Sequence, residues 1–283
     1  MIYDLVVAYR LYPGVSKIPI VHKDDKFMLA ELGVASLKQS LEGLMVKIYF
    51  ILDSCPEIYE TMISRYFFEP DCEFIRVEKA GNLATFLLQI DLLCKQAHSE
   101  YVYFAEDDYL YIRGEFKKML NFLTKNPATV DFVTCNDHLD YYTTIQHQVP
   151  VRVKIGQGKH WFNACSTCLT FLTTQKTLRK TRKVFESFTK GSYDVSLWMV
   201  LTKYHILNPF SLIKFSGNRL MLKAIVKAYV HTLPQIFFLR KRNLWVPIPS
   251  IGTHLQCTDI APNINWEQVI SDVETNQILK LSK

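Results

Sequence analysis

The stretch SEYVYFAEDDYLYI, residues 99–112, places an apolar run directly before three acids. Tyr101 to Ala105 are mostly aromatic and β-branched, which is typical of a buried strand. Glu106, Asp107 and Asp108 follow without a break. Because strand side chains alternate, we expect Glu106 and Asp108 to project to the same side where the strand ends.

Carboxylates crowded at the mouth of an apolar strand repel one another unless a cation or a donor-rich ligand neutralises them. A hard divalent ion, Mn²⁺ or Mg²⁺, chelated together with a diphosphate provides that neutralisation. The alternative is a solvated acidic turn that caps the next helix, which the pattern predicts from Glu115 to Leu123. The surrounding sequence favours the first interpretation.

Composition limits the class of protein. At 283 residues and 49% hydrophobic content, the chain is long and apolar enough for one large core, alone or with an appended C-terminal piece. The net charge of +6 suits an anionic ligand or an anionic membrane surface. It falls short of the charge of a nucleic-acid-binding protein, so no nucleic-acid partner is predicted.

The seven cysteines are scattered, and the single CxxC, Cys165 and Cys168, has no second pair beside it. Buried free thiols in a reducing compartment are therefore expected rather than zinc ligands or disulfides. Asp4 interrupts the opening apolar run, and no segment reaches the roughly 18 apolar residues that a membrane span needs. We expect a cytoplasmic protein.

Strand and helix patterns alternate over the first half of the chain. Strands are expected at 3–8, 46–52, 73–77 and 101–105, with helices at 25–42, 56–67 and 83–97. This alternation predicts an α/β fold with a mostly parallel sheet flanked by helices. Ligands of such sheets bind at the carboxyl ends of the strands, where the candidate residues would gather.

The pattern weakens after residue 125. Strands are expected at 130–135 and 161–173 and helices at 178–189 and 195–204, separated by a polar, His-rich loop at 136–160. We therefore predict one domain over 1–205, divided into a regular half of about 1–125 and a less regular half of about 126–205. Residues 206–283 are expected to form a C-terminal helical and loop extension that completes the site.

This arrangement resembles the nucleotide-sugar-dependent glycosyltransferases of the GT-A (Rossmann-like) fold, most closely the family-two type. The resemblance covers roughly residues 1–205 and a patch near 247–256. It implies a catalytic domain over 1–205, with a donor half of about 1–125 and an acceptor half of about 126–205. It implies that the end of the first strand and a second-strand Asp frame the base and ribose of the donor, that a Gly-Asn step precedes a helix, and that the acidic triplet is a DxD-type motif. The donor-binding residues so implied are Ala8, Tyr9, Arg10, Asp53, Lys79, Gly81, Asn82, Glu106 and Asp107.

The resemblance also implies a metal site. Asp108 would ligate the cation directly, and His254, which follows a Gly-containing loop, looks like the C-terminal His that completes the metal shell in several GT-A enzymes. A divalent cation stabilises the charge that develops on a departing diphosphate. For His254 the alternative is a loop His bonded to backbone.

Inverting transfer needs a base for the acceptor hydroxyl. Asp194, at the start of an apolar helix, is the predicted base; the alternative is a helix N-cap, and Glu186 and Asp137 are the fallback bases. His160 and Trp161 are expected to stack on an acceptor sugar, although a Trp at a strand start is also typical of a core.

The predicted function is a metal-dependent transfer of sugar to a hydroxyl of a glycan or lipid-linked acceptor, as in polysaccharide biosynthesis. A sugar-nucleotide pyrophosphorylase would need a Gly-rich, basic phosphate loop where Leu11-Tyr12-Pro13-Gly14 stands. A non-catalytic nucleotide-sugar-binding module would be expected to have lost the acids that this chain keeps.

Residues 214–245 interleave cations with large apolar side chains. This pattern predicts peripheral contact with the inner face of a membrane. The alternative is that the apolar stripe packs on the sheet and that the cations are solvated or bind the donor's phosphates.

Overall fold

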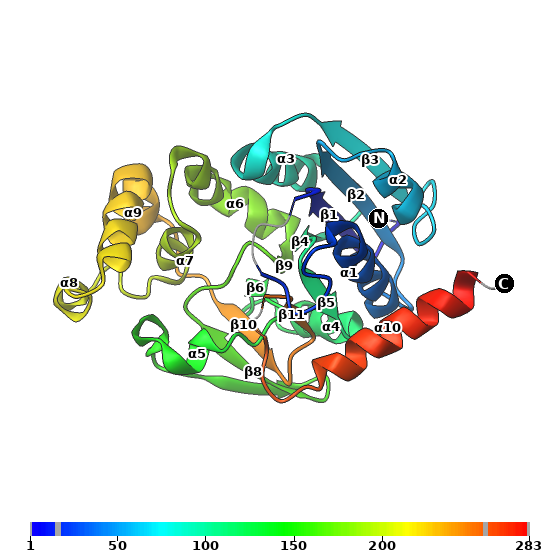
Figure 1. The fold of residues 1–283 in the computed structure, drawn as a ribbon. Coiled ribbons are helices and arrows are strands. Elements are labelled where there is room, and N and C mark those ends of the chain that lie inside the picture. Colours follow the sequence, from blue (N-terminus) through cyan, green and yellow to red (C-terminus); the bar gives the residue numbers. More distant parts are fainter. Residues whose placement is uncertain (1, 15–17, 257–259, 282–283) are drawn as a thin grey trace.

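The computed structural model describes residues 2–14, 18–256 and 260–281. A large sheet carries helices on both faces, and a two-stranded sheet lies beside it (Figure 1). The strands are β1 Leu5–Leu11, β2 Val46–Asp53, β3 Cys72–Val77, β4 Tyr101–Glu106, β5 Tyr109–Tyr111, β6 Phe132–Val133, β7 Val153–Gly156, β8 Lys159–Ala164, β9 Phe171–Thr174, β10 Leu244–Ile248 and β11 Gly252–His254. The helices are α1 Lys26–Ser40, α2 Ile58–Ile63, α3 Gly81–Lys95, α4 Phe116–Lys125, α5 Asp140–Thr143, α6 Gln175–Glu186, α7 Asp194–Thr202, α8 Phe210–Lys214, α9 Arg219–Phe238 and α10 Trp266–Leu281, with 3-10 turns η1 Ile145–His147 and η2 Ser187–Lys190.

The large sheet has the strand order β3-β2-β1-β4-β9-β6-β10-β8-β7. Strands β8 and β9 are antiparallel to their neighbours, and the other strands described in this sheet run in one direction. The predicted α/β class, with a mostly parallel sheet flanked by helices, is confirmed. The carboxyl ends of β1, β2 and β4 therefore meet at one edge.

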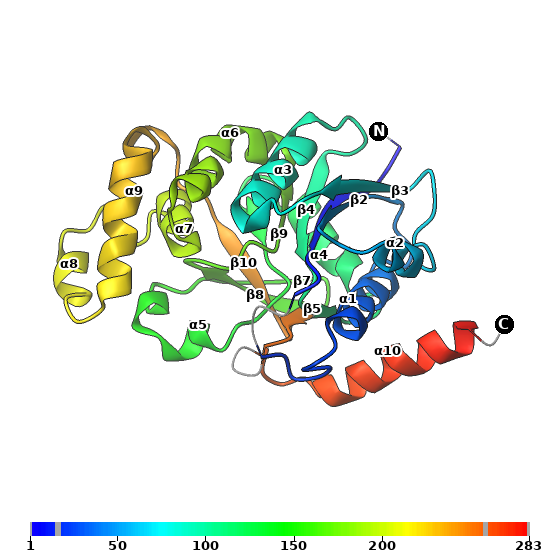
Figure 2. The same cartoon turned by 45° about the horizontal axis from the view of Figure 1, so that its top comes forward.

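Strand β1 is buried along its whole length, as expected for an internal strand covered on both faces. Its side chains alternate between two cores: Val7 packs on the side of α1 and α10, whereas Val6 and Ala8 pack on the side of α3, α6 and α7. Figure 2 shows these two groups of helices on opposite sides of the sheet. Alternation thus fixes which side chains of β1 support each helical layer.

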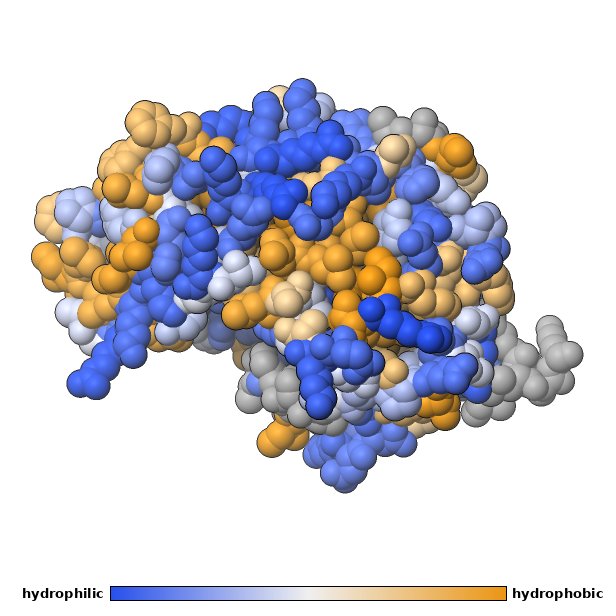
Figure 3. All heavy atoms as spheres, turned by 90° about the horizontal axis from the view of Figure 1, so that it is seen from above, coloured by the Kyte–Doolittle hydropathy of each residue, from blue (hydrophilic) through white to orange (hydrophobic). Residues whose placement is uncertain are grey.

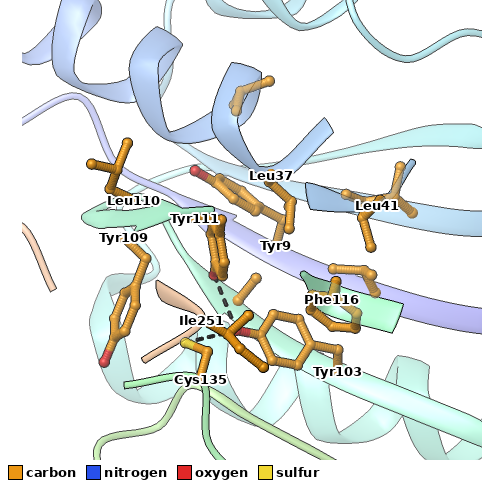
Figure 4. Close-up of a cluster of buried hydrophobic side chains, with 14 of the residues drawn as sticks. Tyr9, Leu37, Leu41, Tyr103, Tyr109, Leu110, Tyr111, Phe116, Cys135 and Ile251 are labelled. Carbon is orange, nitrogen blue, oxygen red and sulfur yellow. Dashed lines mark hydrogen bonds between the residues drawn. The ribbon is translucent and has the colours of Figure 1, made fainter. Parts of the chain in front are cut away.

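The first core continues under the segment that follows the acidic triplet (Figure 4). The hydroxyl of Tyr103 lies 3.1 Å from that of Tyr111 and donates to the Cys135 sulfur at 3.5 Å. These buried polar atoms are satisfied within the core, which anchors β5 immediately after the acids.

The C-terminal segment differs from the prediction. Strand β10 lies inside the large sheet, between β6 and β8, so residues 206–283 are not simply appended to a sheet completed by residue 205. Strand β11 pairs with β5 in the small sheet. The predicted loop at 136–160 also contains α5, η1 and edge strand β7. Short strands without a long apolar run give little periodicity, which explains why the sequence pattern missed them.

Candidate active site

A cavity of about 620 Å³ opens at the carboxyl ends of β1, β2 and β4. It brings together nine of the residues that the sequence singled out: Arg10, Asp53, Gly81, Asn82, Glu106, Asp107, Asp108, Asp194 and His254. Its wall is completed by Leu11, Tyr12, Thr85, Cys168, Leu169, Phe188 and Tyr193. Its size lies within the range of cavities that bind cofactors and small ligands.

Arg10 and Glu106 are direct neighbours in the register of β1 and β4. The Arg10 guanidinium lies 2.5 Å from Glu106 Oε1 and also donates to the backbone oxygen of Asn82 at 2.9 Å. The other Glu106 oxygen accepts a hydrogen bond from Thr170 at 2.8 Å. Protein donors therefore occupy both carboxylate oxygens, and Arg10 ties two strand ends to the start of α3.

Asp107 contacts the segment after β1 and the start of α1. Its carboxylate accepts hydrogen bonds from the Tyr12 backbone N–H at 2.9 Å and contacts Lys26 Nζ at 2.9 Å. Burial raises the pKa of the Asp107 carboxyl, and the nearby Asp108 raises it further, while Lys26 opposes the shift. Asp107 is thus neutralised by a protein cation.

Asp108 faces His254. The imidazole Nε2 lies 2.8 Å from Asp108 Oδ2, and the backbone N–H of Leu255 donates to the Asp108 carbonyl at 2.7 Å. The pairing of β11 with β5 brings these segments together. Gly252 permits it, because a Cβ at that position would lie 2.9 Å from the Leu110 carbonyl oxygen. The His predicted from the distant C-terminal loop therefore lies beside the acidic triplet.

Asp53 organises the turn before α3. Its two carboxylate oxygens accept the backbone N–H groups of Ala80 at 3.0 Å and Gly81 at 2.7 Å. Gly81 has φ +75°, a left-handed conformation that favours glycine. Asp53 consequently shapes the cavity wall as well as lining it.

Asp194 begins α7 and accepts a hydrogen bond from the Val195 N–H at 2.7 Å. It borders the main cavity and also a second, smaller one of about 100 Å³. Polar and aromatic side chains line the second cavity, including His138, Tyr141 and Gln146. Asp194 therefore stands where two neighbouring chambers meet.

Other predicted residues do not line the main cavity. Ala8 and Tyr9 are fully buried in β1, and Lys79 is exposed on the turn, where its backbone N–H donates to Ser54 Oγ. The three residues can affect a ligand in this cavity only through the backbone or the wall that they support.

The expectation for Trp161 as an acceptor-stacking residue is wrong. Its ring is fully buried and stacks on Phe122 with centroids 4.0 Å apart, so no face is open to a sugar. His160 is exposed on β8 and does not line either cavity. The aromatic residue at this strand start belongs to the core.

The fallback bases also lie outside both cavities. Glu186 pairs with Arg182 on α6. Asp137 is buried, and both its oxygens accept from the Tyr142 hydroxyl, at 2.8 and 2.9 Å. Burial raises the pKa of Asp137 to about 6, and the Tyr142 hydrogen bond only partly offsets this shift.

Asp108 and His254 supply two donor atoms suited to a divalent cation. In the described ranges, no group of three or more His, Cys, Asp or Glu side chains is arranged to hold a metal ion. Glu106 and Asp107 are neutralised by Arg10 and Lys26, which leaves the Asp108–His254 pair. One carboxylate and one imidazole fit a cation that takes its remaining ligands from substrate phosphates and water.

Lys26, Tyr12 and Thr170 contact the acidic triplet but were not predicted from the sequence. Lys26 had a usable signal, because it opens the helix after β1, and that helix begins at the same edge as the strand ends. No sequence signal indicated Thr170, because its contact with Glu106 depends on the pairing of β9 with β4 in the sheet.

No family model and no curated protein matches this chain. Similar solved structures include the galactosyltransferase LgtC in complex with donor and acceptor sugar analogs, with a TM-score of 0.38 and 13% identity over 69% of each chain. Another is CMP:2-keto-3-deoxy-manno-octonic acid synthetase complexed with CTP, with a TM-score of 0.40 and 10% identity over 75% of this chain and 86% of that one. At these values the likenesses establish neither a family nor an activity.

Proposed function

We propose that this chain is a metal-dependent glycosyltransferase that moves a sugar from a nucleoside-diphosphate sugar to a hydroxyl group. The observation that carries the proposal is the main cavity. It gathers the Asp108–His254 pair, the turn that Asp53 holds and the helix-start acid Asp194 at the carboxyl edge of the sheet. Such an edge is where ligands of open α/β sheets bind.

On the donor side, Asp108 and His254 would hold Mn²⁺ or Mg²⁺ together with the diphosphate of the donor. The bound cation supplies charge neutralisation for the leaving diphosphate. Arg10 and Lys26 fix the two remaining acids, Glu106 and Asp107, so that the triplet keeps its shape when a charged ligand enters. The turn at Gly81 and Asn82 forms the wall for the nucleoside.

On the acceptor side, Asp194 would take the proton from the attacking hydroxyl. The second cavity gives the acceptor a place, because it adjoins the main cavity at Asp194 and is lined with hydrogen-bonding groups. A base on the acceptor side and a leaving diphosphate on the donor side describe a single displacement, which inverts the anomeric configuration.

A screen of nucleoside-diphosphate sugars with Mn²⁺ or Mg²⁺ tests the proposal. We expect slow release of the nucleoside diphosphate from one donor, lost when EDTA removes the metal and accelerated by an acceptor. Pyrophosphate formation from a nucleoside triphosphate and a sugar phosphate would instead identify a pyrophosphorylase. Tight nucleotide-sugar binding without turnover, across glycan and lipid-linked acceptors, would identify a binding module.

A further inference from the structure

Helices α8 and α9 lie together at one end of the molecule (Figure 1). Large apolar side chains are unusually exposed there: Phe210 is 71% exposed, Ile213 70%, Val230 70% and Phe238 89%. Figure 3 shows apolar side chains gathered at this end. Concentrated exposure of this kind marks an interaction surface rather than ordinary scatter.

Helix α9 has two distinct faces. Met221, Ala224, Ala228, Thr232 and Ile236 are buried, and α9 packs against α7. The opposite side, which we call the outward face, consists of Arg219, Lys223, Val226, Val230, Leu233 and Phe237, all exposed. Arg219, Lys223, Val226 and Val230 recur at steps of three and four, which places them on one side of the helix before the backbone break at Thr232, and Leu233 and Phe237 are exposed beyond that break. The outward face is cationic in its first turns and apolar beyond them.

Charge indicates what can cover this face. From Val195 to Thr258 the chain contains eight Lys and Arg residues and no Asp or Glu. A second copy of the chain would bring an identical acid-free segment against the first, and like charges would repel. An anionic surface is complementary to the segment along its whole length.

We propose that the outward face of α9, together with Phe210 and Ile213 of α8, docks on an anionic phospholipid bilayer. The apolar side chains enter the boundary between headgroups and acyl chains, and Arg219 and Lys223 contact lipid phosphates. The docking is peripheral in geometry: within the described part of the chain, none of the helices is long and apolar enough to cross a bilayer.

The docking surface is joined to the candidate active site. Lys227 of α9 donates a hydrogen bond to the Gly191 carbonyl and places its Nζ 4.2 Å from the centroid of the Tyr193 ring. Tyr193 lines the main cavity next to Asp194. If the proposed function holds, the chemistry takes place beside the bilayer, and the acceptor is a lipid-borne hydroxyl compound.

Co-sedimentation of the full chain with vesicles tests docking without any donor or acceptor. Vesicles of phosphatidylglycerol and phosphatidylcholine are compared with vesicles of phosphatidylcholine alone. We expect binding to the anionic vesicles that weakens as salt rises. We expect Val230→Ser/Phe237→Ser to lower the partition coefficient at least tenfold, and Arg219→Gln/Lys223→Gln to lower it by roughly an order of magnitude at low salt.

Ile155→Ser on β7 is the matched control, since Ile155 is 80% exposed but lies outside α8 and α9. It should bind like the unsubstituted chain, and thermal melting should show that all variants are folded. Failure of the unsubstituted chain to sediment would overturn the proposal, as would full binding by the Val230→Ser/Phe237→Ser variant. A dimer in light scattering that this variant dissociates, without vesicle binding, would assign the face to a second copy. Donor hydrolysis in solution is measured separately, so loss of docking and loss of the proposed function remain distinguishable.

Discussion

Asp108 and His254 are 146 positions apart in the chain, yet Oδ2 of one lies 2.8 Å from Nε2 of the other. The contact exists because β11 pairs antiparallel with β5, which follows the acidic triplet directly. The contact joins a carboxylate and an imidazole from segments far apart in the sequence, and these are the two metal ligands that we propose. The pair is therefore where the proposed metal dependence is most directly tested.

Asp108→Asn should abolish metal-dependent binding of nucleoside diphosphates. The amide keeps the shape and can still hydrogen-bond to His254, but it lacks the charge that holds a divalent cation. Calorimetric titration of diphosphates with Mn²⁺ and with EDTA measures the effect. Glu73→Gln, at an exposed position on β3, is the control and should bind normally. Undiminished Mn²⁺-dependent binding by Asp108→Asn would remove Asp108 from the metal site.

His254 should act jointly with Asp108 in holding the cation. The effects of Asp108→Asn and His254→Gln on Mn²⁺ affinity should be non-additive, with a coupling free energy of about 0.5–3 kcal/mol, because the two groups touch and share one ligand. His98 precedes β4 at its other end, so His98→Gln combined with Asp108→Asn should give additive effects. Additivity in the first pair would show that His254 only positions the carboxylate or packs beside it.

Asp53→Ala should destabilise the protein and weaken diphosphate binding together. The substitution leaves the N–H groups of Ala80 and Gly81 without their acceptor, which costs about 1–3 kcal/mol in the free energy of unfolding. Asp53→Asn keeps one acceptor oxygen, so its losses of unfolding free energy and of diphosphate affinity should be smaller. Urea unfolding and diphosphate titration measure the two effects. Weaker binding at unchanged stability would instead mean that Asp53 contacts the ligand directly.

The first half of the fold could be predicted because its signals are local. Buried strands such as β1 and β4 are continuous apolar runs, and parallel strands that share a direction put their end residues at one edge. Arg10, Asp53 and Glu106 line one cavity, at the edge that the strand pattern predicted. Which residues meet at this edge depends only on the order of the strands in the sheet and on the alternation of side chains along each strand.

The second half could not be predicted in the same way. The position of β10 between β6 and β8 is a long-range pairing that leaves no periodic mark in a five-residue strand. Trp161 was compatible with a sugar contact, although a Trp at a strand start is more often part of the core. Its stacking partner Phe122 lies on α4, whose position relative to β8 the sequence does not reveal. The proposed acceptor side of the candidate site depends on such tertiary contacts.

The stability of the protein should depend on pH through Asp137. Its pKa is raised by burial to about 6 in the folded state, against about 3.9 unfolded, so between these values the folded state binds more protons. Stability from this group is therefore fully present only below the unfolded pKa of about 3.9 and is lost as the pH rises through about 6, by about 3 kcal/mol in all. Asp137→Asn cannot ionise and should lack this fall. Urea unfolding from about pH 3 to 7 measures it.

Glu57→Gln is the control for this pH dependence, because Glu57 is exposed and its substitution should leave the curve unchanged. A curve for Asp137→Asn that parallels that of the unsubstituted chain would show that Asp137 is not the group responsible.

Asp194→Asn should lower sugar transfer by roughly 100-fold or more while leaving donor affinity unchanged, because a base for the acceptor hydroxyl takes no part in holding the donor. The amide can still accept the hydrogen bond from the Val195 N–H, so the start of α7 should keep its structure. Transfer to an acceptor and binding of the intact donor are measured on the same preparation. Glu186→Gln, which removes an acid outside both cavities, should transfer normally. Equal losses of transfer and donor affinity would assign Asp194 to the donor pocket.

The stereochemistry provides an independent check, since a base on the acceptor side of one displacement requires product with inverted anomeric configuration. Product with retained configuration would exclude this role, and Asp194 would then be a contact to the donor sugar.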